Sequence, residues 1–224
     1  MNSTNPFIYS DDNKRDHTLN YYNKSSFNSK VFKAVIDAGF TCPNKDGTKG
    51  TGGCIYCMGG SGYFTEKSDG EIYDSVKRQL AAEKKRIYKK HPNSLITAYF
   101  QANTNTYAPV ATLKEAYTAA LDSEVHGISI GTRADCLPDD VIALLCDINS
   151  KTHLTVELGL QTVHDKTAQI INRCYSYDEF LEGYRKLQES GIRTCLNLID
   201  GFPGEHQADM LETAKEAARL NTTS

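Results

Sequence analysis

The strongest constraint on the fold is a regular alternation of β-type and α-type segments along the chain. Segments rich in β-forming residues cover 31–37, 95–100, 127–131, 154–160 and 193–199. After each one comes a segment with apolar residues at helical spacing, such as 71–90 and 138–148. Five such units in series predict an α/β fold, with a parallel sheet and its helices outside. Ligands of such sheets gather at the carboxyl ends of the strands, where the polar and glycine-rich turns fall.

The length and the two ends of the chain indicate one main domain. With 224 residues there is enough chain for one substantial core. Residues 1–30 show no clear period, and we expect an N-terminal extension packed on a core formed by 31–224. The last helix is expected to present Leu211, Ala214 and Ala218 as its apolar residues. No apolar run approaches the ~20 residues that span a bilayer and no signal peptide is evident, so we expect a cytoplasmic protein.

Three cysteines lie in a glycine-rich stretch from 37 to 64. Cys42, Cys54 and Cys57 have the spacing C-x11-C-x2-C. A [4Fe–4S] cluster held by three thiolates keeps one iron free to bind another molecule. A structural zinc site needs four ligands, and the stretch has no fourth cysteine and no histidine before His91. A disulfide framework is typical of small secreted domains, which this chain does not resemble. Three buried structural cysteines would be expected in a stretch with more core-forming residues than this glycine-rich one has. The pattern therefore favours a cluster.

The residue before the last of these cysteines carries a resemblance. Tyr56 gives the ending C-I-Y-C, which resembles the C-x-aromatic-C ending of the radical S-adenosylmethionine (SAM) superfamily. The wide gap between the first two cysteines is similar to that of the Elongator catalytic subunit family. The resemblance covers roughly 33–220 and implies a partial (β/α) TIM-type barrel, in which the free iron of the cluster is chelated by SAM. Because such cores usually have six βα units, it also implies that the sixth is missing here and that the chain is truncated.

The same resemblance implies which residues contact SAM. The turn after the second strand is similar to the segment that binds the amino group of SAM, although non-glycine residues replace its glycines. The stretch V-E-L-G-L-Q-T and the residues after it are similar to the oxygen-independent coproporphyrinogen dehydrogenase branch, with Gln161 and Arg173 at the ribose and carboxylate of SAM. In the fifth strand, Asn197 falls at the ribose position and Ile199 at the adenine. The full set implied is Tyr56, Gln101, Ala102, Asn103, Thr104, Gln161, Arg173, Asn197 and Ile199.

One carboxylate is predicted to point into the barrel. Side chains two apart in a strand share a face, so Glu157 and Gln161 point the same way. A buried carboxylate needs a partner, and we expect Arg133 to supply it. Two interpretations remain open: a structural brace, or a contact with substrate or SAM. Glu157 and Arg133 are therefore the candidate catalytic residues. The remaining cysteines lack ligand spacing and are expected to be core or surface thiols: Cys136, Cys146, Cys174 and Cys195.

Three longer stretches narrow the resemblance to the bacterial radical SAM proteins of the YhcC/YtqA type. They are P-F-I-Y-S-D-D-N-K-R-D-H-T-L-N-Y-Y, D-A-G-F-T-C-P-N-K-D-G-T-K-G-T-G-G-C-I-Y-C and I-G-T-R-A-D-C-L-P. The resemblance implies reductive cleavage of SAM to a 5′-deoxyadenosyl radical, with an electron donor such as flavodoxin or ferredoxin. For the Gram-positive members it implies modification of the tRNA wobble uridine, converting a carboxymethylaminomethyl group to aminomethyl.

The charge pattern leaves the substrate open. The formal net charge is −3, but seven basic residues and one acid lie between Lys77 and Lys90. Such a run is either a solvated helix face or a surface for nucleic acid such as tRNA. Two further functions remain open: a radical SAM enzyme that acts on a small metabolite, and a non-catalytic scaffold that binds an iron–sulfur cluster or zinc.

Overall fold

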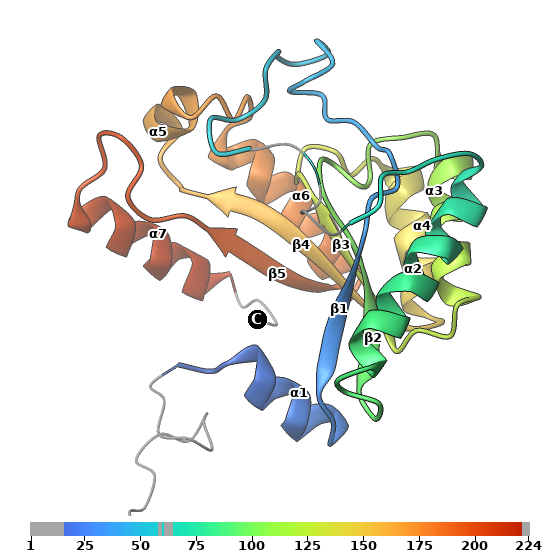
Figure 1. Ribbon diagram of the computed structural model, residues 1–224. Helices are drawn as coiled ribbons and strands as arrows, with labels where there is room; N and C mark the ends of the chain where they lie inside the picture. The colour runs from blue at the N-terminus through green and yellow to red at the C-terminus, as the bar shows by residue number, and fades with distance from the viewer. Residues whose placement is uncertain (1–15, 58–59, 61–64, 221–224) are drawn as a thin grey trace, which may run out of the picture.

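The computed structural model describes residues 16–57, 60 and 65–220. Five strands form one parallel sheet in the order β1-β2-β3-β4-β5, as predicted (Figure 1). The strands are β1 (Val31–Ile36), β2 (Leu95–Phe100), β3 (Gly127–Thr132), β4 (His153–Gln161) and β5 (Arg193–Leu198). In the described residues β1 and β5 are the edges of the sheet, so the barrel is open between them.

Helices connect the strands and cover one face of the sheet. They are α2 (Ile72–Tyr88), α3 (Val110–Leu121), α4 (Asp139–Asn149), α5 (Asp165–Ile170), α6 (Tyr177–Glu189) and α7 (Gln207–Arg219). Local sequence sets several of these ends: Ser176 caps α6 with its side chain, and Glu179 completes a capping box. Pro138 precedes α4, where a missing N–H removes no helical hydrogen bond.

The helix-covered, convex face of the sheet contains the hydrophobic core. Alternate residues of β1 to β4, among them Ile36, Phe100, Ile130 and Leu158, are fully buried there. Each such side chain contributes roughly 1.5–3 kcal/mol by leaving water. The residues between them point to the opposite, concave face, which is largely polar: Lys33, Thr97, Ser129, Thr155, Glu157, Arg193, Cys195 and Asn197.

A helix that the sequence pattern did not predict covers the amino-terminal end of the concave face. Helix α1 (Leu19–Phe27) begins at Thr18, whose side chain accepts a hydrogen bond from the Tyr21 amide at 3.1 Å. Phe27 packs edge-on against His126 and His153, with ring centroids 4.4 and 5.0 Å apart. Asn23, a polar residue, is the buried residue of α1, so the helix shows no strong apolar period. Residues 1–15 of the expected N-terminal extension lie outside the described part.

The expected apolar face of the last helix is wrong. Leu211 is 50% exposed, and Ala214 and Ala218 are exposed as well. The buried residue of α7 is Thr213, whose hydroxyl accepts a hydrogen bond from the Val163 amide at 3.3 Å. Thr213, with Ala217 one turn later packed against the core, therefore faces the sheet in place of the predicted residues. In the described residues, no helix has both the length and the apolar character to cross a membrane.

Candidate functional site

A loop after β1 carries the three cysteines across the carboxyl ends of the strands. It runs from Asp37, and Figure 1 shows it at the same end of the sheet as α5. The Thr104 amide donates to the Thr41 carbonyl at 3.1 Å, which joins the loop to the turn after β2. The Ile55 amide donates to the Ile171 carbonyl at 3.1 Å, which joins it to the end of α5. The loop is therefore fixed at both ends, and residues 58–59 and 61–64 of the cysteine stretch lie outside the described part.

Two asparagines that sequence reasoning missed hold this loop in place. Asn44 is fully buried, and its amide nitrogen donates to the Asn172 carbonyl and, at 3.5 Å, to the Cys54 sulfur. The side chain of Asn172 donates in turn to the Gly53 carbonyl at 2.8 Å. Asn172 has a φ of 54° just after α5, a conformation that asparagine adopts readily. An asparagine directly after a helix was the one sequence signal for this clamp.

Neighbouring groups act on the pKa of the Cys54 thiol in opposite directions. Burial raises the pKa of Cys54; the hydrogen bonds from Tyr56 and Asn44 and the Arg133 charge oppose this, while Cys42 adds to the rise. The Cys57 amide donates to the Cys54 carbonyl at 2.9 Å, so these two residues share a tight turn.

Within the described residues, no three His, Cys, Asp or Glu side chains form a set that could hold a single metal ion. A four-iron cluster binds each cysteine to a different iron, so its ligands need not converge on one point.

The turn after β2 contains the predicted contacts to the SAM amino group. Asn103 has a φ of 62°, and its side chain is already bound: it accepts from Lys45 Nζ at 2.7 Å and donates to the Phe40 carbonyl at 2.9 Å. Its side chain therefore holds the cysteine loop. Thr104 is 1% exposed, and its hydroxyl has no hydrogen-bond partner. Asn105, a residue not predicted, donates to the carbonyls of Phe100, Ala102 and Gly131 and so fixes the turn against β3. Gln101 begins the turn and is partly buried.

The end of β4 bends back over the concave face. The register with β5 shifts between Gly159 and Gln161, and Gln161 has a φ of 59°. A Cβ on Gly159 would lie 2.1 Å from Gln161 Nε2, so any larger residue would displace this amide from its present position. Gln161 is 7% exposed, and its Oε1 has no hydrogen-bond partner. The Ile199 amide donates to the Gln161 carbonyl at 3.1 Å, which places Ile199 beside it, one residue beyond β5.

Arg173 is bound to the protein itself. It is fully buried and donates to the carbonyls of Leu160, Thr162 and Tyr175 at 2.6, 2.7 and 3.1 Å. Only its Nη2 is buried without a hydrogen bond, 3.7 Å from Asp165 Oδ1. In this structure the guanidinium braces the turn after β4, and the predicted contact with the SAM carboxylate has at most this one nitrogen to use.

The expected pairing of Arg133 with Glu157 is wrong. Arg133 follows the end of β3, where its side chain reaches the loops and forms two hydrogen bonds with Asp135, at 2.9 and 2.8 Å. Lys49 adds a second ion pair with Asp135 at 2.7 Å. Although burial acts to raise the pKa of Asp135, these two cations hold it below its usual value. Arg133 also lies over the ring of Tyr175, 4.6 Å from its centroid.

Glu157 is bound on the concave face by other residues. It is 5% exposed, forms an ion pair with Lys33 from β1, and accepts a hydrogen bond from Ser129. Burial and the Glu157 carboxylate both raise the pKa of Tyr99, which also donates to it. Lys33, Ser129 and Glu157 are among the residues that line a cavity of about 500 Å³ between α1 and the sheet. Asn197 is exposed on the same face, beyond Cys195.

The residues at the carboxyl ends of the strands fit the cofactors that the resemblance implies. Three thiols on one fixed loop are the ligand type that iron–sulfur clusters use. At the same ends of the strands, Gln161 Oε1 and Thr104 Oγ1 are buried polar atoms that the protein leaves without partners. Such atoms are rare in folded proteins and call for a ligand. The ring of Tyr56 lies 5.8 Å from that of Phe202, on the β5 side of the same region.

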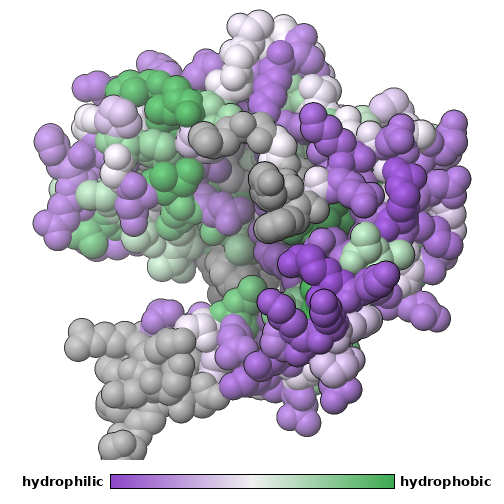
Figure 2. Space-filling view, in the orientation of Figure 1, coloured by the Kyte–Doolittle hydropathy of each residue, from purple (hydrophilic) through white to green (hydrophobic). Residues whose placement is uncertain are grey.

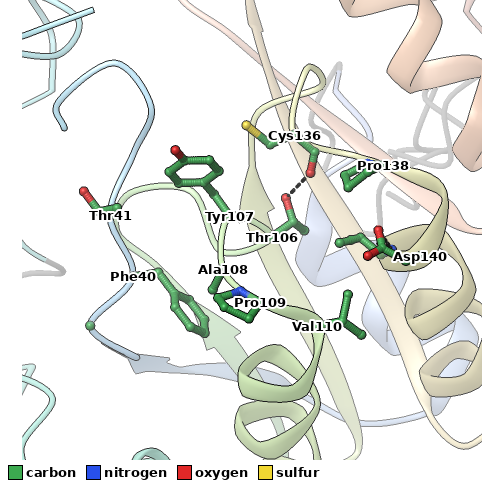
Figure 3. Close-up of a pocket in the computed structure, with 12 residues that line it drawn as sticks. Phe40, Thr41, Thr106, Tyr107, Ala108, Pro109, Val110, Cys136, Pro138 and Asp140 are labelled. Atoms are coloured by element: carbon green, nitrogen blue, oxygen red, sulfur yellow. Dashed lines mark hydrogen bonds between the residues drawn. The ribbon is translucent and has the colours of Figure 1, made fainter. Parts of the chain in front are cut away.

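A second cavity lies away from the concave face, between the starts of α3 and α4 and the start of the cysteine loop (Figure 3). It has a volume of about 610 Å³ and a mostly apolar lining that includes Phe40, Val110 and Cys136. Thr106 donates to the Cys136 carbonyl at 2.6 Å and joins the two turns. Burial and the neighbouring Asp135 raise the pKa of Cys136 to about 12, so its thiol stays protonated at neutral pH. Cys146 is exposed, and Cys174 and Cys195 are partly buried.

Comparison with known sequences gives the same class of protein. Residues 46–217 match the model of the radical SAM superfamily. The chain is 48% identical over 223 residues to YtqA of Bacillus subtilis, covering 99% of this chain and 68% of that protein. It is 38% identical over 189 residues to YhcC of Escherichia coli K12, covering 84% of this chain and 59% of that protein. A tRNA-2-methylthio-N(6)-dimethylallyladenosine synthase of Endomicrobium trichonymphae is 31% identical over 81 residues, covering 35% of this chain and 19% of that protein.

Solved structures share the fold. The archaeal Elp3 of Methanocaldococcus infernus superposes with a TM-score of 0.57 at 17% identity, over 84% of this chain and 42% of that one. Coproporphyrinogen III oxidase (HemN) of Escherichia coli, a radical SAM enzyme, gives 0.53 at 16% identity, over 87% of this chain and 42% of that one. The chain belongs to the radical SAM superfamily, whose enzymes use a [4Fe–4S] cluster and SAM.

Proposed function

We propose that this radical SAM enzyme modifies the wobble uridine of tRNA, converting a carboxymethylaminomethyl group to aminomethyl. The observation that carries the proposal is the polar concave face directly below the cysteine loop. It provides a cavity of about 500 Å³ toward the amino-terminal ends of the strands, below the place where the cofactors bind, and Lys33, Glu157 and Arg193 are among its lining residues. A base taken out of the anticodon loop has a place to enter from the carboxyl ends of the strands.

Each residue of the site has one task in this proposal. Cys42, Cys54 and Cys57 hold the cluster, and Gln161 and Thr104 give their unpartnered oxygens to the polar groups of SAM. The backbone of the turn at Gln101 and Ala102, the Tyr56 and Ile199 side chains, and Asn197 complete the SAM site. When bound and reduced, the cluster and SAM supply a 5′-deoxyadenosyl radical that takes a hydrogen atom from the substrate.

The clamp around the loop positions these groups. Asn44 and Asn172 fix Cys54 from below, and Asn103 with Lys45 fixes the turn after β2. A radical reaction needs reactive atoms held in one geometry with water excluded. The fully buried Asn44 and Arg173 exclude water from the underside of the loop.

Two observations support tRNA as the substrate. Six basic residues are exposed on helix α2 and just beyond it: Lys77, Arg78, Lys85 and Arg86 on the helix, and Lys89 and Lys90 after it. Figure 2 shows hydrophilic surface over this helix. Exposed Lys and Arg bind phosphates without regard to sequence. One protein that is similar to part of this chain is named as a tRNA-modifying synthase. A cytoplasmic location, where thiols stay reduced, and a flavodoxin or ferredoxin as electron donor belong to the same proposal.

The first test addresses the radical reaction. Anaerobic reconstitution with iron and sulfide, reduction with dithionite and addition of SAM should yield 5′-deoxyadenosine. Cys54→Ala should lose the iron and the nucleoside product, whereas Cys146→Ala, which removes an exposed thiol, should keep both. Zinc in place of iron in the wild-type protein would favour a non-catalytic scaffold and contradict the proposal.

The second test addresses the substrate. The reconstituted enzyme is incubated with tRNA that carries carboxymethylaminomethyluridine, and the digested nucleosides are quantified. Aminomethyluridine should appear only when SAM and reductant are both present. Binding of this tRNA should weaken steeply with salt, and replacing Lys77 and Arg78 by Gln should reduce the salt dependence. SAM cleavage without any change in tRNA would favour an enzyme that acts on a small metabolite.

A further inference from the structure

The concave face holds one pair of opposite charges that the cofactor site does not use. Lys33 from β1 and Glu157 from β4 meet across the inside of the half-barrel, three strands apart. Glu157 lies four residues before Gln161 in β4, or about 13 Å below it at the rise of a strand. The pair therefore lies below the cofactor site, in the wall of the cavity between α1 and the sheet.

The two partners are held very differently. The Glu157 side chain is 6% exposed and also accepts hydrogen bonds from Ser129 and Tyr99, so its position is fixed. The Lys33 side chain is 37% exposed and lies over the Tyr99 ring, 4.1 Å from its centroid. A half-exposed lysine can leave its partner at little cost, because water and screening weaken such pairs. Glu157 is then a fixed anion beside a movable cation.

The rest of the cavity wall has hydrogen-bonding capacity that the protein does not use. His126 Nε2 and Arg193 Nε are buried and have no hydrogen-bond partner. A structural brace alone would be served equally well by an apolar pair of similar size. Two opposite charges among the lining residues of a cavity are instead complementary to a ligand with both charges.

We propose that Lys33 and Glu157 bind the zwitterionic part of the substrate, a secondary ammonium one carbon away from a carboxylate. Lys33 turns from Glu157 to the carboxylate of the substrate. Glu157, still held by Ser129 and Tyr99, accepts the ammonium. This inference rests on the proposed function, because the carboxymethylaminomethyl group has these two charges at this spacing. The product, which keeps the amine and loses the carboxylate, has lost its contact with Lys33, and this favours product release.

The test compares the binding of matched RNAs to the reconstituted enzyme without reductant. The probes are fluorescent 17-nucleotide anticodon stem-loops whose wobble uridine carries no group, aminomethyl, carboxymethyl or carboxymethylaminomethyl. Anisotropy gives the dissociation constants. We expect the wild type to bind the zwitterionic loop about 10- to 100-fold tighter than the unmodified loop, the effect of one or two charge-assisted hydrogen bonds.

Two variants assign the two charges. Lys33→Met should bind the carboxymethylaminomethyl and aminomethyl loops equally, since it cannot detect the carboxylate. Glu157→Gln should bind the carboxymethylaminomethyl and carboxymethyl loops equally, since it cannot detect the ammonium. Lys30→Met is the control, because it removes an exposed lysine from the end of the same strand without touching the pair.

A charge exchange separates recognition from bracing. The double variant Lys33→Glu, Glu157→Lys restores an ion pair across the sheet but reverses its direction. It should recover the melting temperature lost by either single exchange without recovering the preference for the zwitterionic loop. If the wild type shows the preference and Lys33→Met and Glu157→Gln keep it, the inference is wrong while the proposed function stands. If the wild type binds no stem-loop, or binds all four equally, the tRNA substrate and this inference both fall.

Discussion

The two faces of the sheet come from alternate residues of the same strands and differ in almost every respect. On β3, Ile128 and Ile130 are fully buried under helices, while Ser129 between them faces the cavity. On β4, Val156 and Leu158 are likewise buried in the core, and Glu157 between them points to the concave side. One face contributes stability by burying apolar surface, and the other keeps polar groups available.

This difference shows how the functional face of a sheet can be recognised from its strand sequences. A parallel sheet covered on both sides has almost continuous apolar strands. Here the sequences I-S-I and V-E-L interrupt that run with a polar residue at the inward position. A polar group in such a place is costly unless it has partners, so its presence points to a function for that face.

The largest expected effect separates neighbours on β3. Ile130→Ala should lower the free energy of unfolding by about 2–5 kcal/mol, because it leaves a cavity in the core. Ser129→Ala should lower it by only about 1 kcal/mol, because Glu157 loses one of several hydrogen bonds. Urea unfolding of the cofactor-free protein measures both. Equal losses would mean that the concave face contributes as much stability as the convex one.

A second change acts on the concave face alone. Gly159→Ala places a methyl group 2.1 Å from Gln161 Nε2 and so displaces that amide. The affinity for SAM should fall by about tenfold, the effect of one lost hydrogen bond in the site. Calorimetry on the cluster-loaded protein measures it, and Thr97→Ala, lower on the same face, serves as the control. An unchanged affinity in Gly159→Ala would remove Gln161 from the SAM site.

Much of the fold could be predicted because its signals are local. Each strand and each outer helix has its own apolar pattern, and the parallel order follows from their alternation. Helix α1 was missed because Asn23 is its only buried residue, so no pattern marks it. The face of α7 was misassigned because its buried residue, Thr213, is polar and so leaves no apolar signal.

For the site, the sequence predicted which way the side chains of a strand point, but not which residues they contact. The two-residue period correctly placed Glu157 inside, but its partner Lys33 is 124 residues away and belongs to another strand. Choosing Lys33 over Arg133 requires the strand order and the register, which no short stretch contains. The same holds for Asn44 and Asn172, which are 128 residues apart and lie in two loops.

The amino-terminal end of the concave face should respond to acid. Burial, with the charges of Arg193 and His126, lowers the pKa of His153 to about 4. An unfolded histidine titrates near ~6.5, so the folded state resists taking up this proton. The contribution of His153 to stability should be complete above pH ~6.5 and fall by about 1 kcal/mol toward pH 4, after allowance for its partly exposed ring.

Melting temperatures between pH 7.5 and 4.5 measure this slope, and His153→Gln should flatten it. Thr97→Ala serves as the control, because this residue lines the same cavity and does not titrate. If His153→Gln and the wild type lose stability in parallel, other groups cause the acid sensitivity and the histidine pair under Phe27 is not its origin.

The smallest expected effect tests how α7 is oriented. Leu211→Ser should change the free energy of unfolding by less than about 0.5 kcal/mol, because this side chain is already half exposed. Thr213→Ala should cost about 1 kcal/mol, since it removes the acceptor of the Val163 amide. Apolar pattern alone predicts the reverse order. If Leu211→Ser proves the more costly, α7 packs through the predicted apolar residues and not through Thr213.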